Sequence, residues 1–277
     1  MGRGGEAVSD GSASEWILQR DMHVHSGYSD GEDDFEAIIA RAVDIGVRRL
    51  AVTDHFEIGR PNSVRVPPDQ YLHAFRQAQD LAARKGVDLL LGVETGVAGG
   101  RLLCPDQVLA AADLVVASVH EIRPGECGFS PADLADLPEE EYWACYQRQV
   151  LQAARAEFVD VLGHVEGYLP ARWSRYPGAL DFAGRRRAEA EIVRRFFPLS
   201  FYRELAAILR IRGVAVELHG MSCSPRLEVA RILREEGCTF SIGSDAHALH
   251  DLGHVGHAAR VAGVLGLGPR DFHPLCR

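Results

Sequence analysis

The stretch Asp21-Met22-His23-Val24-His25 places two histidines two residues apart, just before the turn-forming sequence Ser29-Asp30-Gly31. Side chains two apart in a β-strand point to the same side, so one strand end can present both imidazoles to one centre. Asp245 and His247 repeat this spacing at the end of the last apolar run in the chain. The two pairs predict strand ends that converge on one polar centre.

Short apolar runs alternate with longer amphipathic stretches along the rest of the chain. The expected strands are Asp21–His25, Leu50–Thr53, Leu89–Glu94, Leu114–His120, Val159–His164, Val214–His219 and Phe240–Asp245. Helical patterns lie at Phe35–Ile45, Tyr71–Ala83, Glu139–Phe158, Glu204–Arg212, Arg226–Glu236 and near Val255–Leu265. Strands that alternate with helices indicate βαβ units and a parallel sheet.

A closed barrel explains the polar residues better than an open sheet does. An open doubly wound sheet gathers its polar groups at the switch point between neighbouring strands. Here nearly every expected strand ends in a residue of the metal-binding type. We therefore expect residues 19–277 to form a single barrel domain behind a flexible tail at residues 1–18. The stretches 124–138 and 171–203 are expected to be insertions over the barrel mouth.

Composition narrows the class of protein. The 277 residues carry a formal charge of −9, which weighs against gripping nucleic acid as the main function. The six cysteines form no C-x-x-C pair, so we interpret them as free thiols of a reducing compartment. The sequence shows no secretory signal and no apolar run of about 18 residues, and we expect a cytoplasmic protein without membrane contact.

Eight residues at or just after the expected strand ends have the chemistry of metal ligands. Active sites of parallel α/β barrels lie at the C-terminal ends of their strands. Imidazole and carboxylate together are ligands for zinc, manganese or iron. A lone histidine is more often a hydrogen-bonded core residue, but a shared metal site explains the full set better. The set is His23, His25, His55, Glu94, His120, His164, Asp245 and His247.

These motifs resemble those of the PHP family, named for its polymerase and histidinol phosphatase members. The resemblance extends from about Asp21 to Gly256, through Thr53-Asp54-His55, Gly92-Val93-Glu94, Ser118-Val119-His120, Gly163-His164 and Gly243-Ser244-Asp245-Ala246-His247. It implies a distorted (β/α)7 barrel, two or three divalent metal ions (Zn, Mn or Fe) and hydrolysis of phosphate esters. The stand-alone length is most similar to that of the histidinol-phosphatase branch.

The resemblance also implies a role for each ligand. Glu94 would bridge two metals, His120 and His164 would complete the second site, and His55 and His247 would serve a third. The nucleophile would be a hydroxide that bridges two metals and attacks phosphorus in line. The leaving group would take a proton from Asp54, Asp30 or His247, and the sequence does not choose among them. Asp30 could also cap a helix, and Asp54 could orient an imidazole.

The substrate-binding residues follow from the charge of a phosphate ester. Arg123, Arg172 and Arg226 each follow an expected strand end, and we expect at least one of them to bind the phosphate of a small-molecule substrate. Glu217-Leu218-His219 departs from the Glu-x-Asn pattern common in relatives, which leaves the substrate-facing details open.

Two other functions stay open at this stage. Trp173 and Tyr176 beside Arg172 and Arg175 would suit a PHP-type nuclease or nucleotide phosphoesterase. A PHP-type domain can also bind metal without turnover. The sequence does not define the oligomeric state, the metal identity or the physiological substrate.

Overall fold

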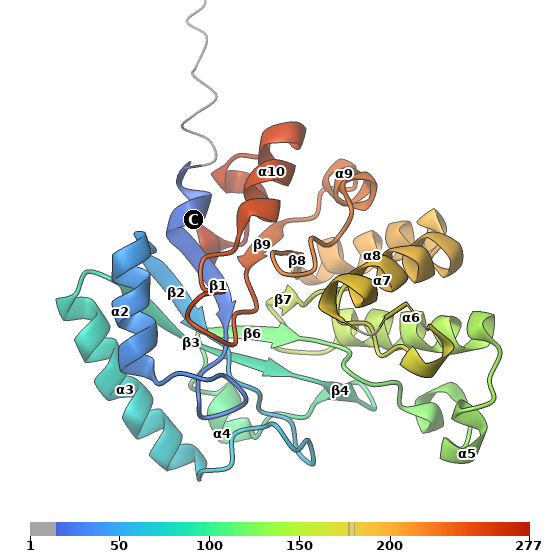
Figure 1. Ribbon diagram of the computed structural model, residues 1–277, viewed down its shortest axis with the longest axis horizontal. Helices are drawn as coiled ribbons and strands as arrows, with labels where there is room; N and C mark the ends of the chain where they lie inside the picture. The colour runs from blue at the N-terminus through green and yellow to red at the C-terminus, as the bar shows by residue number, and fades with distance from the viewer. Residues whose placement is uncertain (1–14, 177, 180) are drawn as a thin grey trace, which may run out of the picture.

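Seven parallel strands form one sheet that curls into a barrel (Figure 1). The computed structural model describes residues 15–176, 178–179 and 181–277. In sheet order the strands are β1 (Arg20–Val24), β2 (Arg49–Val52), β3 (Asp88–Thr95), β6 (Leu114–Ala117), β7 (Val161–Leu162), β8 (Ala215–His219) and β9 (Phe240–Gly243). This confirms the expected PHP-type barrel and all seven of its strands.

The barrel closes where the first strand meets the last. The His25 N–H donates to the Ala246 carbonyl at 2.8 Å, and the Asp245 N–H donates to the His23 carbonyl at 2.8 Å. At the opposite end the C-terminal segment lies beside β9, where the His273 N–H donates to the Phe240 carbonyl at 2.8 Å. The expected ligands therefore lie at the end where β1 and β9 are joined directly.

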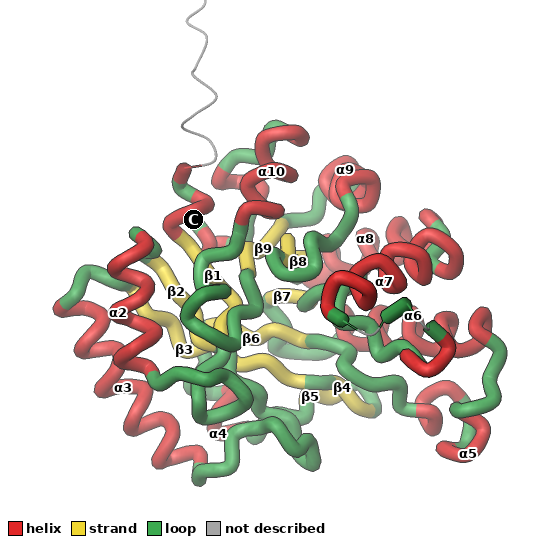
Figure 2. Tube along the Cα trace, in the orientation of Figure 1, coloured by secondary structure: helices red, strands yellow, loops and turns green. Residues whose placement is uncertain are grey.

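Helices surround the sheet, with loops joining them to the strands (Figure 2). The longer helices are α2 (Phe35–Ile45), α3 (Pro68–Arg84), α6 (Glu139–Arg155), α7 (Phe182–Phe196), α8 (Leu199–Arg212), α9 (Leu227–Glu235) and α10 (Gly256–Leu265). The Asp34 carboxylate caps α2 by accepting from the Ala37 N–H, and Gly46 ends it at φ 80°, a conformation that glycine adopts without strain. No helix in the described ranges is long and apolar enough to cross a membrane.

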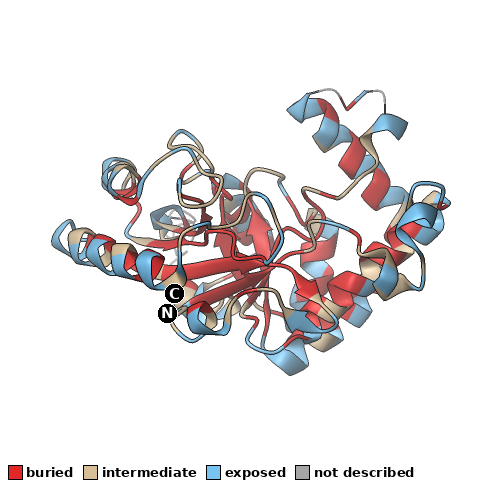
Figure 3. Cartoon of the chain, turned by 90° about the horizontal axis from the view of Figure 1, so that it is seen from below, coloured by how far each residue is buried: buried red, intermediate tan, exposed pale blue. Residues whose placement is uncertain are grey.

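Burial follows the layers of the barrel. The strands and the inner faces of the helices are buried, while the outer faces of the helices are exposed (Figure 3). Ile17 is fully buried in this core, and the ring of Trp16 packs edge-on against Phe272 at 5.0 Å between centroids. The ordered fold thus begins before the expected boundary at residue 19, and residues 1–14 of the expected tail lie outside the described residues.

The two expected insertions contact each other. The first contains the short helix α5 (Pro131–Leu134), and the second contains α7, which is absent from the expected helical patterns. Arg172 and Arg175 of the second insertion donate to the backbone carbonyls of Ala135 and Leu137 in the first. These hydrogen bonds join the two insertions, and they bind the two guanidinium groups to backbone carbonyls.

Two cysteines are also paired, contrary to expectation. Cys127 and Cys145 form a disulfide between the loop after β6 and helix α6, with their Cα atoms 5.7 Å apart. The other four cysteines are free. The interpretation of all six as free thiols was wrong, because the two partners are 18 residues apart and no local motif marks them.

Candidate metal centre

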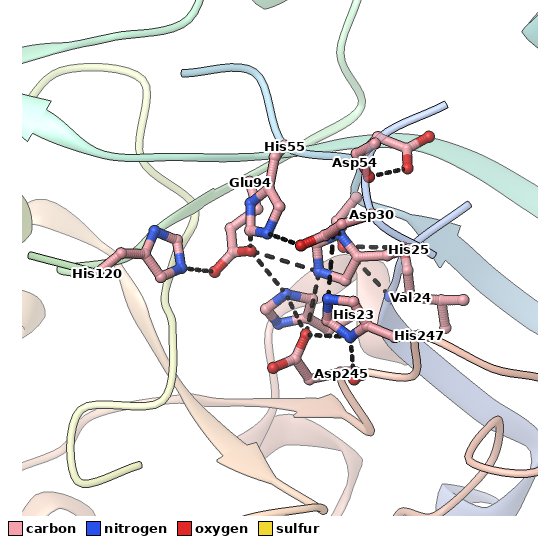
Figure 4. A network of polar contacts seen from close by, with 12 residues as sticks. His23, Val24, His25, Asp30, Asp54, His55, Glu94, His120, Asp245 and His247 are labelled. Carbon is pink, nitrogen blue, oxygen red and sulfur yellow. Dashed lines mark hydrogen bonds and ion pairs between the residues drawn. The ribbon is translucent and has the colours of Figure 1, made fainter. Parts of the chain in front are cut away.

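All eight expected ligands converge at the C-terminal ends of the strands. Figure 4 labels all of them except His164. His23 lies in β1 and Glu94 in β3, while the others directly follow a strand. Six of the eight side chains are at least nine-tenths buried, and only His120 and His247 are more exposed. A barrel with short strands brings these ends within reach of one another, as the sequence predicted.

Glu94 lies at the middle of the cluster. Its Oε1 is 3.0 Å from Nε2 of both His120 and His164. Its Oε2 is 3.0 Å from Nδ1 of His55 and 3.4 Å from Nε2 of His23 and of His25. The two oxygens thus face two different sets of imidazoles, which is the geometry expected of a bridging carboxylate.

Asp245 and Asp30 also contact histidines of the cluster. Oδ1 of Asp245 lies 3.0 Å from Nε2 of His25 and 3.4 Å from Nε2 of His23. Asp30 places Oδ1 3.3 Å from Nε2 of His247 and Oδ2 3.5 Å from Nε2 of His55. Asp30, which could have been only a helix cap, therefore lies within the cluster, and Asp34 caps α2 instead.

The cluster fits divalent cations. Three overlapping groups of side chains each bring their metal-binding atoms within 4.8 Å of one another. His25, His55 and Glu94 each belong to two of these groups. Several buried donor atoms that face the cluster have no hydrogen-bond partner: Nε2 of His23, both ring nitrogens of His25, Nδ1 of His55, Oδ1 of Asp30 and Oδ1 of Asp245. Buried polar atoms are rarely left without partners, so a set of this kind indicates bound ions. The groups are His25, Asp30, His55 and His247; His23, His25, Glu94 and Asp245; and His55, Glu94 and His120.

Glu217 supports this cluster from behind. Its Oε1 lies 2.7 Å from Nδ1 of His23, and its Oε2 accepts a hydrogen bond from the backbone N–H of His164 at 2.8 Å. The carboxylate holds the Nδ1 proton of His23 and so leaves Nε2 free to face the cluster. A Cβ at Gly243 would collide with Glu217 and His23, so only glycine fits beside this pair.

The charges of the cluster shift its pKa values. Burial opposes ionisation of Glu94 and Asp245, yet the surrounding histidines hold the pKa of both carboxyls well below the usual range. Burial lowers the pKa of His55 and His247, but the carboxylates around them outweigh it and raise each pKa to about 9. Burial raises the pKa of Asp30, and its contacts with His247 and His55 more than offset this and lower it. The carboxyls are therefore ionised at neutral pH.

Two adjoining cavities open at the cluster. One of about 260 Å³ is lined by Asp30, His55, Arg60, Glu94, His120, His164, Tyr168, Asp245 and His247. The other, of about 540 Å³, is lined by Glu57, Ile58, Gly59, Arg60, Pro61, Asn62, His120, Glu121 and Arg123. We call them the cluster cavity and the outer cavity. Arg60 and His120 line both, so the outer cavity continues from the cluster.

Arg60 is a site residue that the sequence interpretation missed. Its Nη1 lies 3.3 Å from Oε2 of Glu57, and its Nε donates to Oδ1 of Asn62 at 2.5 Å. The Asn62 amide in turn donates to Asp30 in the cluster. The segment after His55 thus carries a guanidinium to the cluster cavity. This segment contains no recognisable motif, and the sequence indicates its role only by its position after His55.

The three arginines expected to bind phosphate have different positions. Arg123 lines the outer cavity, where its Nη2 lies 2.7 Å from Oε1 of Glu57. Arg172 instead stacks on Tyr142 at 4.2 Å and donates to Glu139 and to backbone carbonyls. Arg226 is held by Glu166 at 2.8 Å and lines neither cavity. Acidic neighbours and carbonyls hold the Arg172 and Arg226 side chains, and neither lines the cluster cavity or the outer cavity, so Arg123 is the candidate that remains among the three.

Asp54 is not placed to be the catalytic acid. Its side chain is fully buried and points away from the cluster (Figure 4). Oδ1 accepts from the Ser26 N–H at 2.8 Å and from the Ser29 hydroxyl at 2.6 Å. Oδ2 accepts from the Ser26 hydroxyl at 2.7 Å and from the Tyr71 hydroxyl at 2.8 Å. Asp54 therefore anchors the loop that follows β1, which leaves Asp30 and His247 as the better placed of the three candidate proton donors.

This fold and this cluster define a class of protein: an α/β barrel with a buried histidine and carboxylate centre for divalent metals at its strand ends. The PHP domain model matches residues 21–206, more than half of the chain. The chain belongs to the PHP domain family. The match confirms the resemblance that the strand-end motifs indicated.

Similar proteins agree with this assignment. A probable phosphatase of Edwardsiella ictaluri is 28% identical over 90% of this chain and 86% of its own length. A probable phosphatase of Syntrophotalea carbinolica is 25% identical over 91% of this chain and 90% of its own length. The crystal structure of histidinol phosphate phosphatase from Lactococcus lactis, complexed with zinc, L-histidinol and phosphate, superposes with a TM-score of 0.65 at 19% identity. It covers 90% of this chain and 94% of that one, and it shares the fold.

Proposed function

We propose that this protein hydrolyses the phosphate monoester of a small polar metabolite, with histidinol phosphate as the first substrate to test. The chain is a phosphoester hydrolase by its family and its relatives. The observation that carries the finer proposal is the buried cluster around Glu94, which opens into a cavity large enough for a metabolite. Ligand cavities of enzymes commonly measure about 300–1,000 Å³.

The residues of the three donor groups would hold two or three divalent ions, with Zn, Mn or Fe as candidates. When bound, such ions lower the pKa of water and neutralise charge on phosphoryl oxygens. His164 lies against Oε1 of Glu94 and would join His120 on that side. Glu217 would keep His23 in the tautomer that a ligand needs.

Arg60 would bind the phosphate from outside the ligand set. It lines the cluster cavity, and its guanidinium can donate two parallel hydrogen bonds to phosphoryl oxygens. Glu57 holds both Arg60 and Arg123 at its two oxygens, so the cavity presents both guanidinium groups at fixed positions. We propose that Arg60 contacts the phosphoryl group and that Arg123 contacts the leaving group.

His247 is the best-placed donor of a proton to the leaving group. It is the most accessible ring of the cluster, 37% exposed, and its pKa of about 9 keeps it protonated at neutral pH. Asp30 lies 3.3 Å from Nε2 of His247 and stabilises that proton. The same Nε2 is the ligand expected for a third ion. A count of two metals per chain would support the acid role, and a count of three would support the ligand role.

A nuclease is the second candidate function, and the cavity lining weighs against it. Single strands bind by stacking their bases on aromatic side chains along a basic groove. Among the described residues that line the outer cavity there is no Phe, Tyr or Trp, and its two arginines face two carboxylates, Glu57 and Glu121. Arg172 and Arg175, which the nuclease hypothesis needs, are bound to Glu139 and to carbonyls. The cavity favours a small polar leaving group.

Phosphate release from a substrate panel tests the proposal. The panel contains histidinol phosphate, sugar phosphates, nucleotides and short oligonucleotides, each with added Zn²⁺, Mn²⁺ or Fe²⁺. We expect metal-dependent turnover of a small monoester that is lost in His120→Ala. Turnover of oligonucleotides alone would support the nuclease. Metal binding without any turnover would identify a binding module.

A further inference from the structure

His219 occupies a buried position directly behind the metal cluster. The side chain is fully buried, and its Nε2 lies 3.1 Å from Oδ2 of Asp245. In the sequence, this histidine stands where the Glu-x-Asn pattern of relatives has an amide. The structure shows Glu217 contacting His23 and His219 contacting Asp245, so the two residues lie behind two different members of the cluster.

The hydrogen bonds of His219 determine which nitrogen carries its proton. The Ser222 backbone N–H lies 3.1 Å from Nδ1 of His219 and can only donate, so Nδ1 must be an acceptor. The Ser222 hydroxyl, at 2.6 Å from the same Nδ1, can donate as well. A neutral imidazole then has its proton on Nε2, which donates to Oδ2 of Asp245.

This donation leaves Asp245 with one free oxygen. Oδ2 accepts from His219, whereas Oδ1 is buried without a hydrogen-bond partner and faces His23 and His25. Asp245 also has a φ of 61°, an uncommon left-handed conformation for a residue with a side chain. Such conformations persist when the surroundings hold them in place. The contact from His219 is part of that support.

We propose that His219 is a positioning residue that restricts Asp245 to binding metal through Oδ1 alone. His219 is not itself a ligand, because Nδ1 accepts from Ser222 and Nε2 carries the proton. It provides one N–H to Oδ2 of Asp245. The inference rests on the proposed metal site and not on the identity of the substrate.

Metal titration of four variants of the full-length protein tests the inference. His219→Asn keeps an N–H donor, while His219→Leu and His219→Phe remove it and still fill the space. His257→Leu is the matched control, since it removes a buried imidazole whose Nε2 lies near the Pro225 carbonyl, away from the cluster. The readouts are bound metal per chain, the affinity for Zn²⁺ and Mn²⁺ in competition with a chelating dye, and the melting temperature in EDTA.

We expect the affinity for one ion to fall about 10- to 100-fold in His219→Leu, the range typical for residues that orient a metal ligand. His219→Asn and His257→Leu should bind metal like the wild type. In EDTA, His219→Leu should melt no lower than His257→Leu. If His219→Leu does not fold, His219→Phe provides the same comparison.

Three results would overturn the proposal. These are wild-type affinity in His219→Leu, an affinity in His219→Asn as weak as in His219→Leu, or a melting temperature in EDTA far below that of His257→Leu. The last would mean that His219 serves the fold alone. If no protein in the set hydrolyses any phosphate ester, the proposed activity fails, and the metal titration still decides the role of His219.

Discussion

Oε1 of Glu94 lies 3.0 Å from Nε2 of His120, while Oε2 of the same carboxylate faces His55. One side chain would therefore serve two metal positions in the proposed site. Glu94→Gln should lower bound metal by at least one ion per chain and reduce affinity by more than the roughly 100-fold expected for an outer residue. Elemental analysis after dialysis measures the loss. Glu121→Gln, an exposed carboxylate of the outer cavity, is the control and should keep its metal.

Arg60 and Arg172 should respond in opposite ways to truncation. Arg60→Ala should reduce kcat/KM roughly 10- to 100-fold, since a hydrogen bond to a charged group contributes about 1.5–3 kcal/mol. Arg172→Ala should leave kcat/KM unchanged and lower the melting temperature, because it joins the two insertions. Steady-state kinetics and thermal unfolding of both variants check this. Loss of turnover in Arg172→Ala with normal Arg60→Ala would contradict the assignment.

Asp54 should affect stability more than proton transfer. Asp54→Ala leaves the Ser26, Ser29 and Tyr71 donors without their buried acceptor. Such a loss costs about 1–3 kcal/mol for each unpaired group, so we expect a clear drop in the free energy of unfolding. Urea unfolding measures it. If the folded fraction of this variant loses the acid limb of its pH–rate profile, Asp54 has a role in catalysis after all.

Without metal, the stability of the folded chain should fall as the pH rises. His55 and His247 have a pKa of about 9 in the folded chain, against about 6.5 in an unfolded one. Their contribution to stability is complete below pH 6.5 and is lost as the pH rises through 9. Metal affinity should rise over the same range, because ligands must lose their protons.

Urea midpoints in EDTA between pH 6 and pH 9, beside metal titrations in the same buffers, test both trends. A midpoint that stays level or rises with pH in EDTA would show that these imidazoles are not protonated in the folded chain.

The disulfide predicts a thiol count. Cys104, Cys223, Cys238 and Cys276 are free, so the denatured, unreduced protein should react with four equivalents of thiol reagent. Cys145→Ser should lower stability by about 3 kcal/mol, as expected for a loop of this length. Cys223→Ser, at an exposed free thiol, should not. A count of six would mean that Cys127 and Cys145 are reduced.

The barrel and the ligands could be predicted because their signals are local. Hydrophobic periodicity located all seven strands, and Phe35–Ile45 was predicted with both of its observed ends. The expected ligands lie at or after strand ends, and the C-terminal ends of all strands of a parallel barrel lie at the same end of the molecule. Glu94 was predicted to bridge two metals because a carboxylate has two oxygens to share, and that role stays a prediction.

The arginines could not be predicted, because their side chains are long and their partners are distant in sequence. Arg172 and Arg226 each follow an expected strand end along the chain, yet Glu139 and Glu166 hold their side chains elsewhere. Arg60 reaches the cluster cavity from a loop without a motif. α7 was not among the expected helical patterns, although its Ala, Arg and Glu residues favour a helix. Partners such as Cys127 and Cys145 are known only once the elements are packed.

The hydrogen bonds between His25 and Ala246 and between Asp245 and His23 join the two ends of the folded chain. Contacts between distant segments form late, because a long loop must close first. During synthesis, His23 and His25 leave the ribosome more than two hundred residues before Asp245. A growing chain therefore cannot present the complete set of proposed ligands before the last strand has been translated.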